Sequence, residues 1–154
     1  MKRKLRLYLS HPFPERDKIK EWEIEIENKL DIELHNPFYD GWEAKWLVKY
    51  NKKTSSPEEF SKFVKRNYKR IVESDLRALQ RCDGMIAFVP YPSIGVAMEI
   101  LYMSYVLKKP VLIYQPSMIY SIVETHPWLK YFGKIYKTLK GLERGISKLK
   151  RELL

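Results

Sequence analysis

Short apolar runs separated by mixed segments dominate this chain and predict a set of strands. Residues 84–90 and 109–114 are almost wholly apolar, which is typical of strands that are covered on both faces. Residues 5–9 alternate between leucine and other side chains and predict a first strand, which ends at a proline-rich turn. Shorter segments at 31–35 and 134–137 bring the total to about five strands.

The stretches between these strands show helical periodicity and are predicted to be helices. Residues 15–30, 58–81 and 95–107 carry apolar side chains at helical spacing or are apolar throughout, and a basic helix follows residue 137. Residues 54–59 read Thr-Ser-Ser-Pro-Glu-Glu, a strong helix start. Because strands alternate with helices, we predict one α/β domain over 1–154, a flavodoxin-like or Rossmann-like three-layer sandwich with a mainly parallel sheet.

Two acidic residues occupy apolar surroundings in this pattern. Glu99 is the only charged residue between Asp83 and Lys108. Asp75 lies at the centre of an apolar arc of about 120° when 58–81 is drawn as a helix. The arc consists of Phe60, Val64, Tyr68, Ile71, Val72 and Leu79. Because an unpaired buried carboxylate is costly, such a group usually has a partner or a chemical task, and two of them suggest acid/base or nucleophilic chemistry.

The positions of the two acids suggest different roles. We expect Glu99 in or near the first turn of its helix, where the helix dipole lowers the pKa of a carboxylate and keeps it ionised for attack on carbon. Asp75, among apolar neighbours, should have a raised pKa and hold a proton for a leaving group. The alternatives are a Glu99 that pairs with a lysine and an Asp75 that only caps another backbone segment.

Ligands of open parallel sheets bind beyond the carboxyl ends of the strands. The segments 8–13, 36–40 and 90–99 are expected to meet at that edge. Asp75 lies on the helix that precedes the third strand. We expect Asp75 to reach this edge of the sheet only if that helix starts near the edge.

Five further residues are candidates for the same edge. Ser93 and Gly95 offer a hydroxyl and free backbone N–H groups at a helix start, which suits an anion, although a plain helix cap fits equally well. Tyr8 can donate its phenol to a carboxylate or simply pack in the core. Asp40 can contact a base or sugar or serve only as a turn residue. His11 can cover a ligand.

Composition narrows the class of protein. The 154 residues carry a formal charge of +10, which favours an anionic partner: nucleic acid, a membrane surface or a phosphorylated metabolite. Many of the lysines, however, fit a solvated surface. No apolar run approaches the roughly 20 residues that cross a membrane. Cys82 is the single cysteine, and it shows no metal-ligand spacing with the three histidines. We therefore expect a cytoplasmic protein without metal or cofactor.

Two motifs resemble a known family. Asp75-Leu-Arg-Ala-Leu-Gln-Arg-Cys-Asp83 and Pro92-Ser-Ile-Gly-Val-Ala-Met-Glu99, with 7–9 and 109–111, are similar to the nucleoside 2-deoxyribosyltransferase superfamily. That superfamily includes the 2-deoxynucleoside 5-monophosphate N-glycosidases. The resemblance covers roughly residues 4–116. It implies a flavodoxin-like fold and a homodimer or higher homo-oligomer with sites close to a subunit interface.

The resemblance also assigns roles to single residues. Glu99 matches the glutamate that attacks C1 of the sugar, Asp75 the aspartate associated with the leaving base, and Tyr8 the tyrosine that orients the glutamate. Ser93 stands where the transferases have an aspartate and the monophosphate N-glycosidases a serine that contacts the 5-phosphate. Ser117 is a candidate for the residue that a neighbouring subunit donates. In a departure from the glycosidase pattern, His11-Pro-Phe-Pro14 replaces a small phosphate-binding turn.

The sequence therefore predicts an N-glycosidase that acts on 2-deoxynucleoside 5-monophosphates. A nucleoside 2-deoxyribosyltransferase that uses the same residues is the first alternative, and a non-catalytic nucleotide-binding or sensor protein is the second. A nucleic-acid-binding module would fit the basic charge, but it leaves the two carboxylates unexplained. We expect a small-molecule nucleoside or nucleotide as the partner, and neither a membrane nor a nucleic acid.

Overall fold

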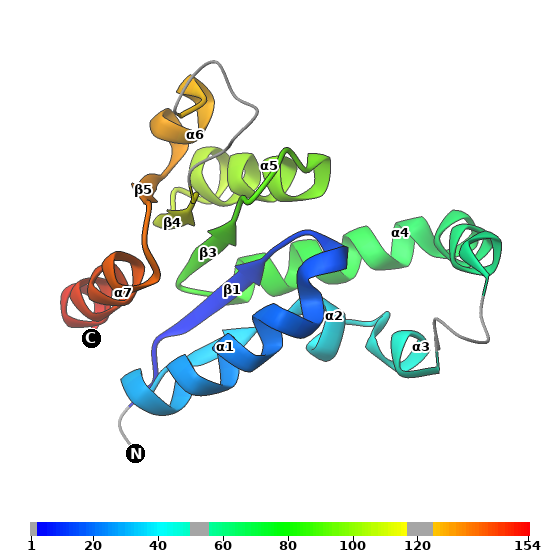
Figure 1. Cartoon of the computed structure of the whole chain (residues 1–154), viewed down its shortest axis with the longest axis horizontal. Helices are drawn as coiled ribbons and strands as arrows, with labels where there is room; N and C mark the ends of the chain where they lie inside the picture. The colour runs from blue at the N-terminus through cyan, green and yellow to red at the C-terminus, as the bar shows by residue number, and fades with distance from the viewer. Residues whose placement is uncertain (1–2, 50–55, 117–124) are drawn as a thin grey trace.

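The computed structural model describes residues 3–49, 56–116 and 125–154. A sheet of five parallel strands forms its centre, in the order β2-β1-β3-β4-β5 (Figure 1). The strands are β1 (Arg6–Ser10), β2 (Glu33–His35), β3 (Gly84–Phe88), β4 (Val111–Tyr114) and β5 (Lys134–Tyr136). This is the flavodoxin-like strand order, which confirms the predicted α/β class and parallel sheet.

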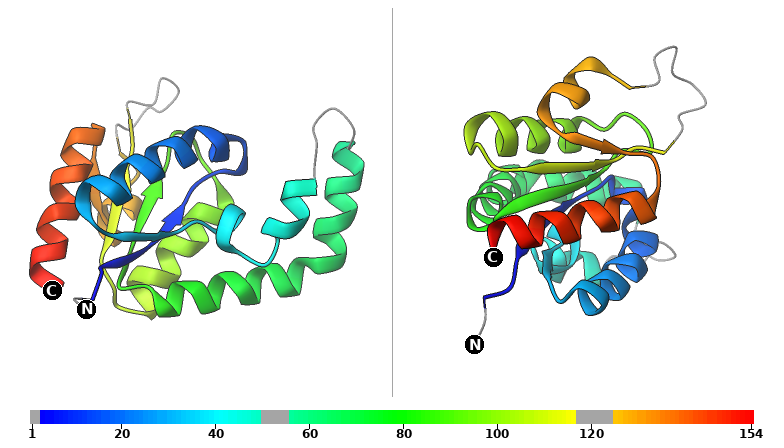
Figure 2. Two further views of the ribbon diagram at one scale, coloured as in Figure 1. Left: turned by 90° about the horizontal axis from the view of Figure 1, so that it is seen from below. Right: turned by 90° about the vertical axis from the view of Figure 1, so that its left-hand side faces the viewer.

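Helices cover both faces of the sheet (Figure 2). They are α1 (Arg16–Leu30), α2 (Pro37–Asp40), α3 (Ala44–Lys49), α4 (Pro57–Arg81), α5 (Ile94–Leu101), α6 (Pro127–Phe132) and α7 (Leu139–Leu153). A 3-10 turn at Phe13–Glu15 precedes α1, and a π-helical turn at Tyr102–Val106 extends α5. One core joins α1 and α7 to the sheet, and the other joins α4 and α5 to its opposite face.

Strand β1 lies inside the sheet and sends side chains into both cores. Leu7 and Leu9 are fully buried in the core beneath α1 and α7. Tyr8 is fully buried in the core beneath α4 and α5. The alternation of a strand therefore directs Tyr8 toward the two helices that carry the predicted acids.

Helix α4 starts where the sequence predicts. Ser56 and Glu59 form a capping box, with Pro57 at the first turn. The N-terminal part of α4 projects beyond the sheet (Figure 2). Two residues of the predicted apolar arc, Tyr68 and Val72, are 55% and 51% exposed, whereas Leu79 is buried beneath the sheet.

An aromatic cluster ties the projecting part of α4 to the rest of the molecule. Trp46 on α3 stacks on Phe63 of α4 with a ring separation of 4.1 Å. Phe60 stacks on Phe13 at 4.9 Å, and Phe13 in turn contacts Phe38 at 5.3 Å. The stretch after Asp40, which the sequence pattern leaves unassigned, thus forms a short helix that packs on α4.

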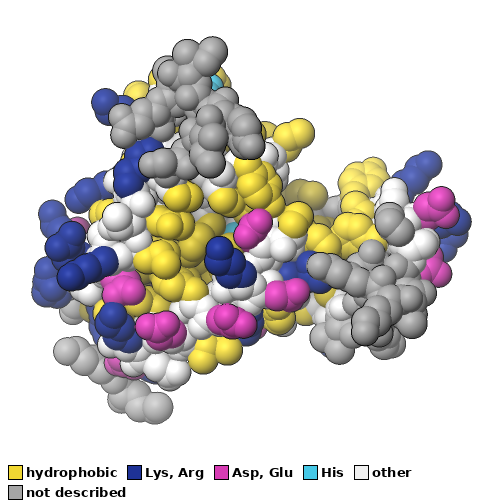
Figure 3. All heavy atoms as spheres, in the orientation of Figure 1, with side chains coloured by type: hydrophobic (Ala, Val, Ile, Leu, Met, Phe, Trp, Pro, Cys, Tyr) yellow, Lys and Arg dark blue, Asp and Glu magenta, His cyan; other side chains and the backbone are white. Residues whose placement is uncertain are grey.

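Basic and hydrophobic side chains are concentrated in different parts of the surface shown in Figure 3. On the face shown in Figure 3, Lys and Arg side chains gather at the left, over α7, and hydrophobic side chains occupy the middle. Among the residues that the structure describes, no helix has both the length and the hydropathy to span a bilayer.

Candidate active site

Glu99 on α5 is held from β1 by two hydroxyl groups. Tyr8 donates its phenolic hydrogen to Oε1 of Glu99 at 2.7 Å. Ser10 donates its hydroxyl hydrogen to Oε2. Tyr8 and Ser10 are two residues apart on one strand and so face the same side of the sheet. Each oxygen of the Glu99 carboxyl group therefore has its own donor, which orients the group.

The predicted pKa of Glu99 is wrong. Helix α5 begins at Ile94, so Glu99 lies near the first turn, in the early part of the second. Burial raises the pKa of Glu99, and the hydrogen bonds from Ser10 and Tyr8 lower it again without cancelling that effect. The helix dipole fades beyond the first turn, so the two hydroxyl groups are what stabilise the ionised form.

Asp75 has the protonation state that its apolar surroundings predict. Burial raises its pKa to about 8, and the charges of Glu43 and Glu99 add to the rise. The neighbouring phenol of Tyr8 lowers the pKa in part. Its Oδ1 is buried without a hydrogen-bond partner. Asp75 is therefore a protonated acid at neutral pH beside a carboxylate that accepts two hydrogen bonds.

Asp75 approaches the site from α4. The condition for this was that its helix start near the carboxyl edge of the sheet, and Phe60, near the start of α4, stacks on Phe13 just after β1. Asp75 accordingly influences the pKa of Tyr8. The contact arises because Tyr8 points from the sheet into the layer formed by α4 and α5, where Asp75 lies on the inner face of α4.

Two residues of the site were missed by sequence reasoning. Ser10 was interpreted only as the first residue of the turn that stops the strand 5–9, whereas β1 includes it, so Ser10 faces the same side as Tyr8. Glu43 precedes α3 and is 5% exposed, and its buried Oε2 has no hydrogen-bond partner among the residues that the structure describes. Its charge raises the pKa of Asp75, of Glu99 and of Tyr8. The one signal in the sequence is that Glu43 is the only acid between Asp40 and Glu58.

The predicted anion-binding loop keeps its groups open. Ser93 is the N-cap of α5, but its side chain makes no capping hydrogen bond. Gly95 has no atom within 4 Å of the position where a Cβ would stand. Within the described residues no hydrogen bond or ion pair links either residue to Glu99. A ligand role for Ser93 and Gly95 stays a prediction.

His11 and Asp40 belong to a polar network beside the site. His11 is buried, and its ring nitrogens lie 3.0 Å from Asn36 Oδ1 and 3.2 Å from the Pro12 carbonyl oxygen. Burial lowers the pKa of His11. Asp40 is exposed and accepts the backbone N–H of Asn36 at 2.8 Å. Both residues hold the loop after β2, and substrate contacts by either one stay predictions.

The remaining expectations concern metals and the partner-derived serine. Ser117 lies outside the described residues. Over 3–49, 56–116 and 125–154, no three His, Cys, Asp or Glu side chains are grouped so that they could hold a metal ion.

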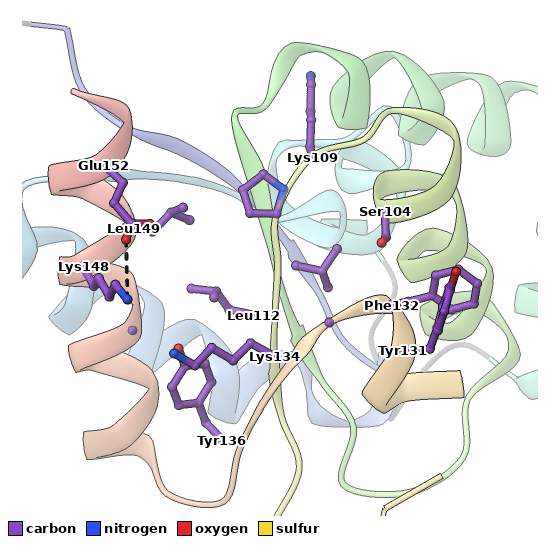
Figure 4. A pocket seen from close by; sticks show the side chains of 14 residues that line it. Ser104, Lys109, Leu112, Tyr131, Phe132, Lys134, Tyr136, Lys148, Leu149 and Glu152 are labelled. Atoms are coloured by element: carbon purple, nitrogen blue, oxygen red, sulfur yellow. Dashed lines mark ion pairs between the residues drawn. The ribbon is translucent and has the colours of Figure 1, made fainter. Parts of the chain in front are cut away.

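A pocket of about 550 Å³ lies elsewhere, between α6, α7 and the starts of β4 and β5 (Figure 4). The cations that line it already have partners. Lys109 donates to the carbonyl oxygens of Gln80 and Cys82, Lys148 pairs with Glu152, and Lys134 lies over the ring of Tyr136. The residues that line this pocket include none of the group around Glu99, and we assign no chemistry to it.

Comparison with known proteins adds little to this geometry. No protein-family model matches the chain, and no curated protein matches it. Among solved structures, the CMP N-glycosidase BcmB of Clostridium botulinum is similar, with 20% sequence identity and a TM-score of 0.49. The match covers 93% of this chain and 98% of that one. Similarity at this level carries no conclusion about activity or substrate, so the function proposed for this chain rests on its own site.

Proposed function

We propose that this chain cleaves the N-glycosidic bond of 2-deoxynucleoside 5-monophosphates, with Glu99 as nucleophile and Asp75 as general acid. The observation that carries the proposal is the pairing of two carboxyl groups of different character around one phenol. Glu99 accepts hydrogen bonds from Tyr8 and Ser10, which favour its ionised form. Asp75, with a pKa of about 8, keeps its proton at neutral pH. Such a pair is what retaining glycosidases use.

In the first step, a carboxylate oxygen of Glu99 attacks C1 of the sugar while the bond from C1 to the base nitrogen breaks. The base leaves with the bonding electrons and takes the proton of Asp75. The transition state carries positive charge on the sugar, which the Glu99 carboxylate stabilises. Proton donation to a leaving group typically contributes about 10²–10⁴-fold to the rate.

In the second step, water or a second nucleobase attacks C1 and breaks the ester bond between C1 and Glu99. Asp75, now ionised, accepts the proton from the attacking water, and the sugar phosphate is released. A second nucleobase in place of water would give base exchange. The same residues therefore serve a 2-deoxyribosyltransferase, which is the second candidate.

Ser93 supports a monophosphate as the substrate. Its hydroxyl is not used as a helix cap, and it precedes free N–H groups at the start of α5. This arrangement suits the 5-phosphate, in keeping with the resemblance at Ser93. The net charge of +10 also favours an anionic substrate.

The test is release of free base from the common 2-deoxynucleosides and their 5-monophosphates, measured by chromatography. We expect release from monophosphates by the wild type and its loss in Glu99→Gln, which keeps the side-chain size. Glu143→Gln on α7, on the opposite side of the sheet, is the matched control and should retain activity. Release that requires an added acceptor base would replace hydrolysis with transfer. Folded wild-type protein that releases no base from any substrate would refute the proposal.

A further inference from the structure

Glu43 is a buried acid near the site that the two chemical steps do not use. It is 5% exposed, and its Oε2 is buried without a hydrogen-bond partner. No ion pair to Glu43 occurs among the residues that the structure describes. Burial raises the pKa of Glu43, and a hydrogen bond from its own backbone N–H lowers it in part. An ionised Glu43 whose Oε2 lacks a donor is costly, so a donor group on a bound ligand would stabilise the carboxylate.

The backbone around Glu43 is anchored directly to the helix that carries Asp75. The N–H of Trp42 donates to Oγ of Ser74, the residue before Asp75, at 3.3 Å. On the other side of Glu43, its carbonyl oxygen accepts the N–H groups of Trp46 and Leu47 at 3.0 Å each. The first bond ties the segment of Glu43 to the turn of α4 that carries Asp75, and the other two fix Glu43 at the start of α3.

Electrostatics indicate which part of the site Glu43 faces. Of the two neighbouring carboxylates that raise the pKa of Asp75, Glu43 has the larger effect and Glu99 the smaller one. In the proposed reaction Asp75 serves the leaving base, whereas Glu99 serves the sugar. The hydrogen bond from Trp42 to Ser74 likewise places the segment of Glu43 next to Asp75, so Glu43 lies on the side of the site that receives the base.

We propose that Glu43 selects bases that carry an exocyclic amino group, and this inference rests on the proposed function. An amino group at C4 of a pyrimidine or C6 of a purine donates a hydrogen bond to the free carboxylate oxygen. An oxo group at the same position directs its lone pairs toward the Glu43 carboxylate oxygen, so this position of the base offers that oxygen no donor. Selection of this kind arises because a site built around a hydrogen bond rejects the analogue that lacks the donor.

Two substrate pairs test the amino group. dCMP and dUMP differ in the amino or oxo group at C4 and in the hydrogen that N3 of dUMP carries, and dAMP and dIMP differ in the same way at C6 and N1. We expect the wild type to prefer the amino member of at least one pair by about 10- to 100-fold in kcat/KM, the range for one hydrogen bond to a charged group. In Glu43→Gln the preference should fall to near unity, because an amide can turn either its oxygen or its NH₂ toward the base.

A binding measurement separates this inference from the proposed reaction. Affinities for the four nucleotides are measured by calorimetry in Glu99→Gln and in the double variant with Glu43→Gln. A preference for the amino members that disappears with Glu43→Gln supports the inference even if no base is ever released. Glu143→Gln on α7 should leave the preference unchanged.

Three outcomes would overturn the inference. The first is a wild type with no preference in either pair, which needs no variant to interpret. The second is a preference that survives Glu43→Gln in a folded protein. The third is a loss of affinity in Glu43→Gln that is equal for amino and oxo substrates, which would assign the carboxylate to a sugar hydroxyl.

Discussion

Replacing Asp75 by asparagine should make the protein more stable at alkaline pH while it impairs the proposed reaction. The carboxyl group has an ordinary pKa of 3.8 when the chain is unfolded and a pKa of about 8 in the folded protein. Between these two values the unfolded chain loses the proton while the folded protein keeps it. The free energy of unfolding therefore falls as pH rises through this window, and asparagine removes that penalty.

The size of the effect follows from the same two values. Each pH unit between 3.8 and about 8 is worth about 1.4 kcal/mol, so the full difference is at most about 6 kcal/mol. Because Asp75 is only partly buried, hydration of its ionised form reduces this figure. We expect Asp75→Asn to exceed the wild type by about 2–6 kcal/mol above pH 8 and to match it near pH 4.

Urea unfolding followed by tryptophan fluorescence, at pH 5, 7 and 9, measures this difference. Glu73→Gln is the control, because Glu73 lies two residues away on α4 with a side chain that is 62% exposed. The control should show the pH dependence of the wild type. A stability difference between wild type and Asp75→Asn that stays constant from pH 5 to pH 9 would refute the assigned protonation state.

Two further predictions concern activity. Tyr8→Phe removes a hydrogen bond that lowers the pKa of Glu99, so kcat should fall about 10- to 100-fold and the acid limb of the pH–rate profile should move to higher pH. An unmoved acid limb would separate Tyr8 from the ionisation of Glu99. Ser93→Ala should raise KM for 5-monophosphates with little change for nucleosides, as steady-state kinetics on matched pairs will measure. An equal rise in KM for both would contradict phosphate binding at Ser93.

Hydrophobic patterning was sufficient to predict the sheet and its main helices. Strands such as β3 are wholly buried, so their apolar runs carry an unambiguous signal. Periodicity also identified the inner face of α4, but it did not reveal what covers that face. Tyr68 and Val72 belong to the predicted apolar arc and yet are largely exposed. Residue type alone did not predict this, because exposure depends on which elements pack against the helix.

The residues of the candidate site could be predicted where the local sequence pattern alone marks them as unusual. Asp75 and Glu99 are isolated charges on apolar faces, and Tyr8 alternates with leucines on a strand, so each is visible locally. Glu43 was missed because it lies in an aromatic turn whose fold depends on packing against α4. The pKa of Glu99 was misjudged for a similar reason, since the starting residue of α5 and the hydroxyl of Ser10 both depend on tertiary structure.

The central place of β1 in the sheet has a consequence for how the protein is made. β1 pairs with β2, which follows soon after it, but its other partner, β3, lies more than seventy residues downstream. During synthesis the side chains of β1 therefore cannot be fully buried until β3 has been made. Forming a contact between residues so far apart in the sequence slows folding. Glu99 emerges later still, so Tyr8 and Ser10 gain their partner only after the centre of the sheet is complete. Protection of the Tyr8 backbone amide from hydrogen exchange should thus be a late event in refolding.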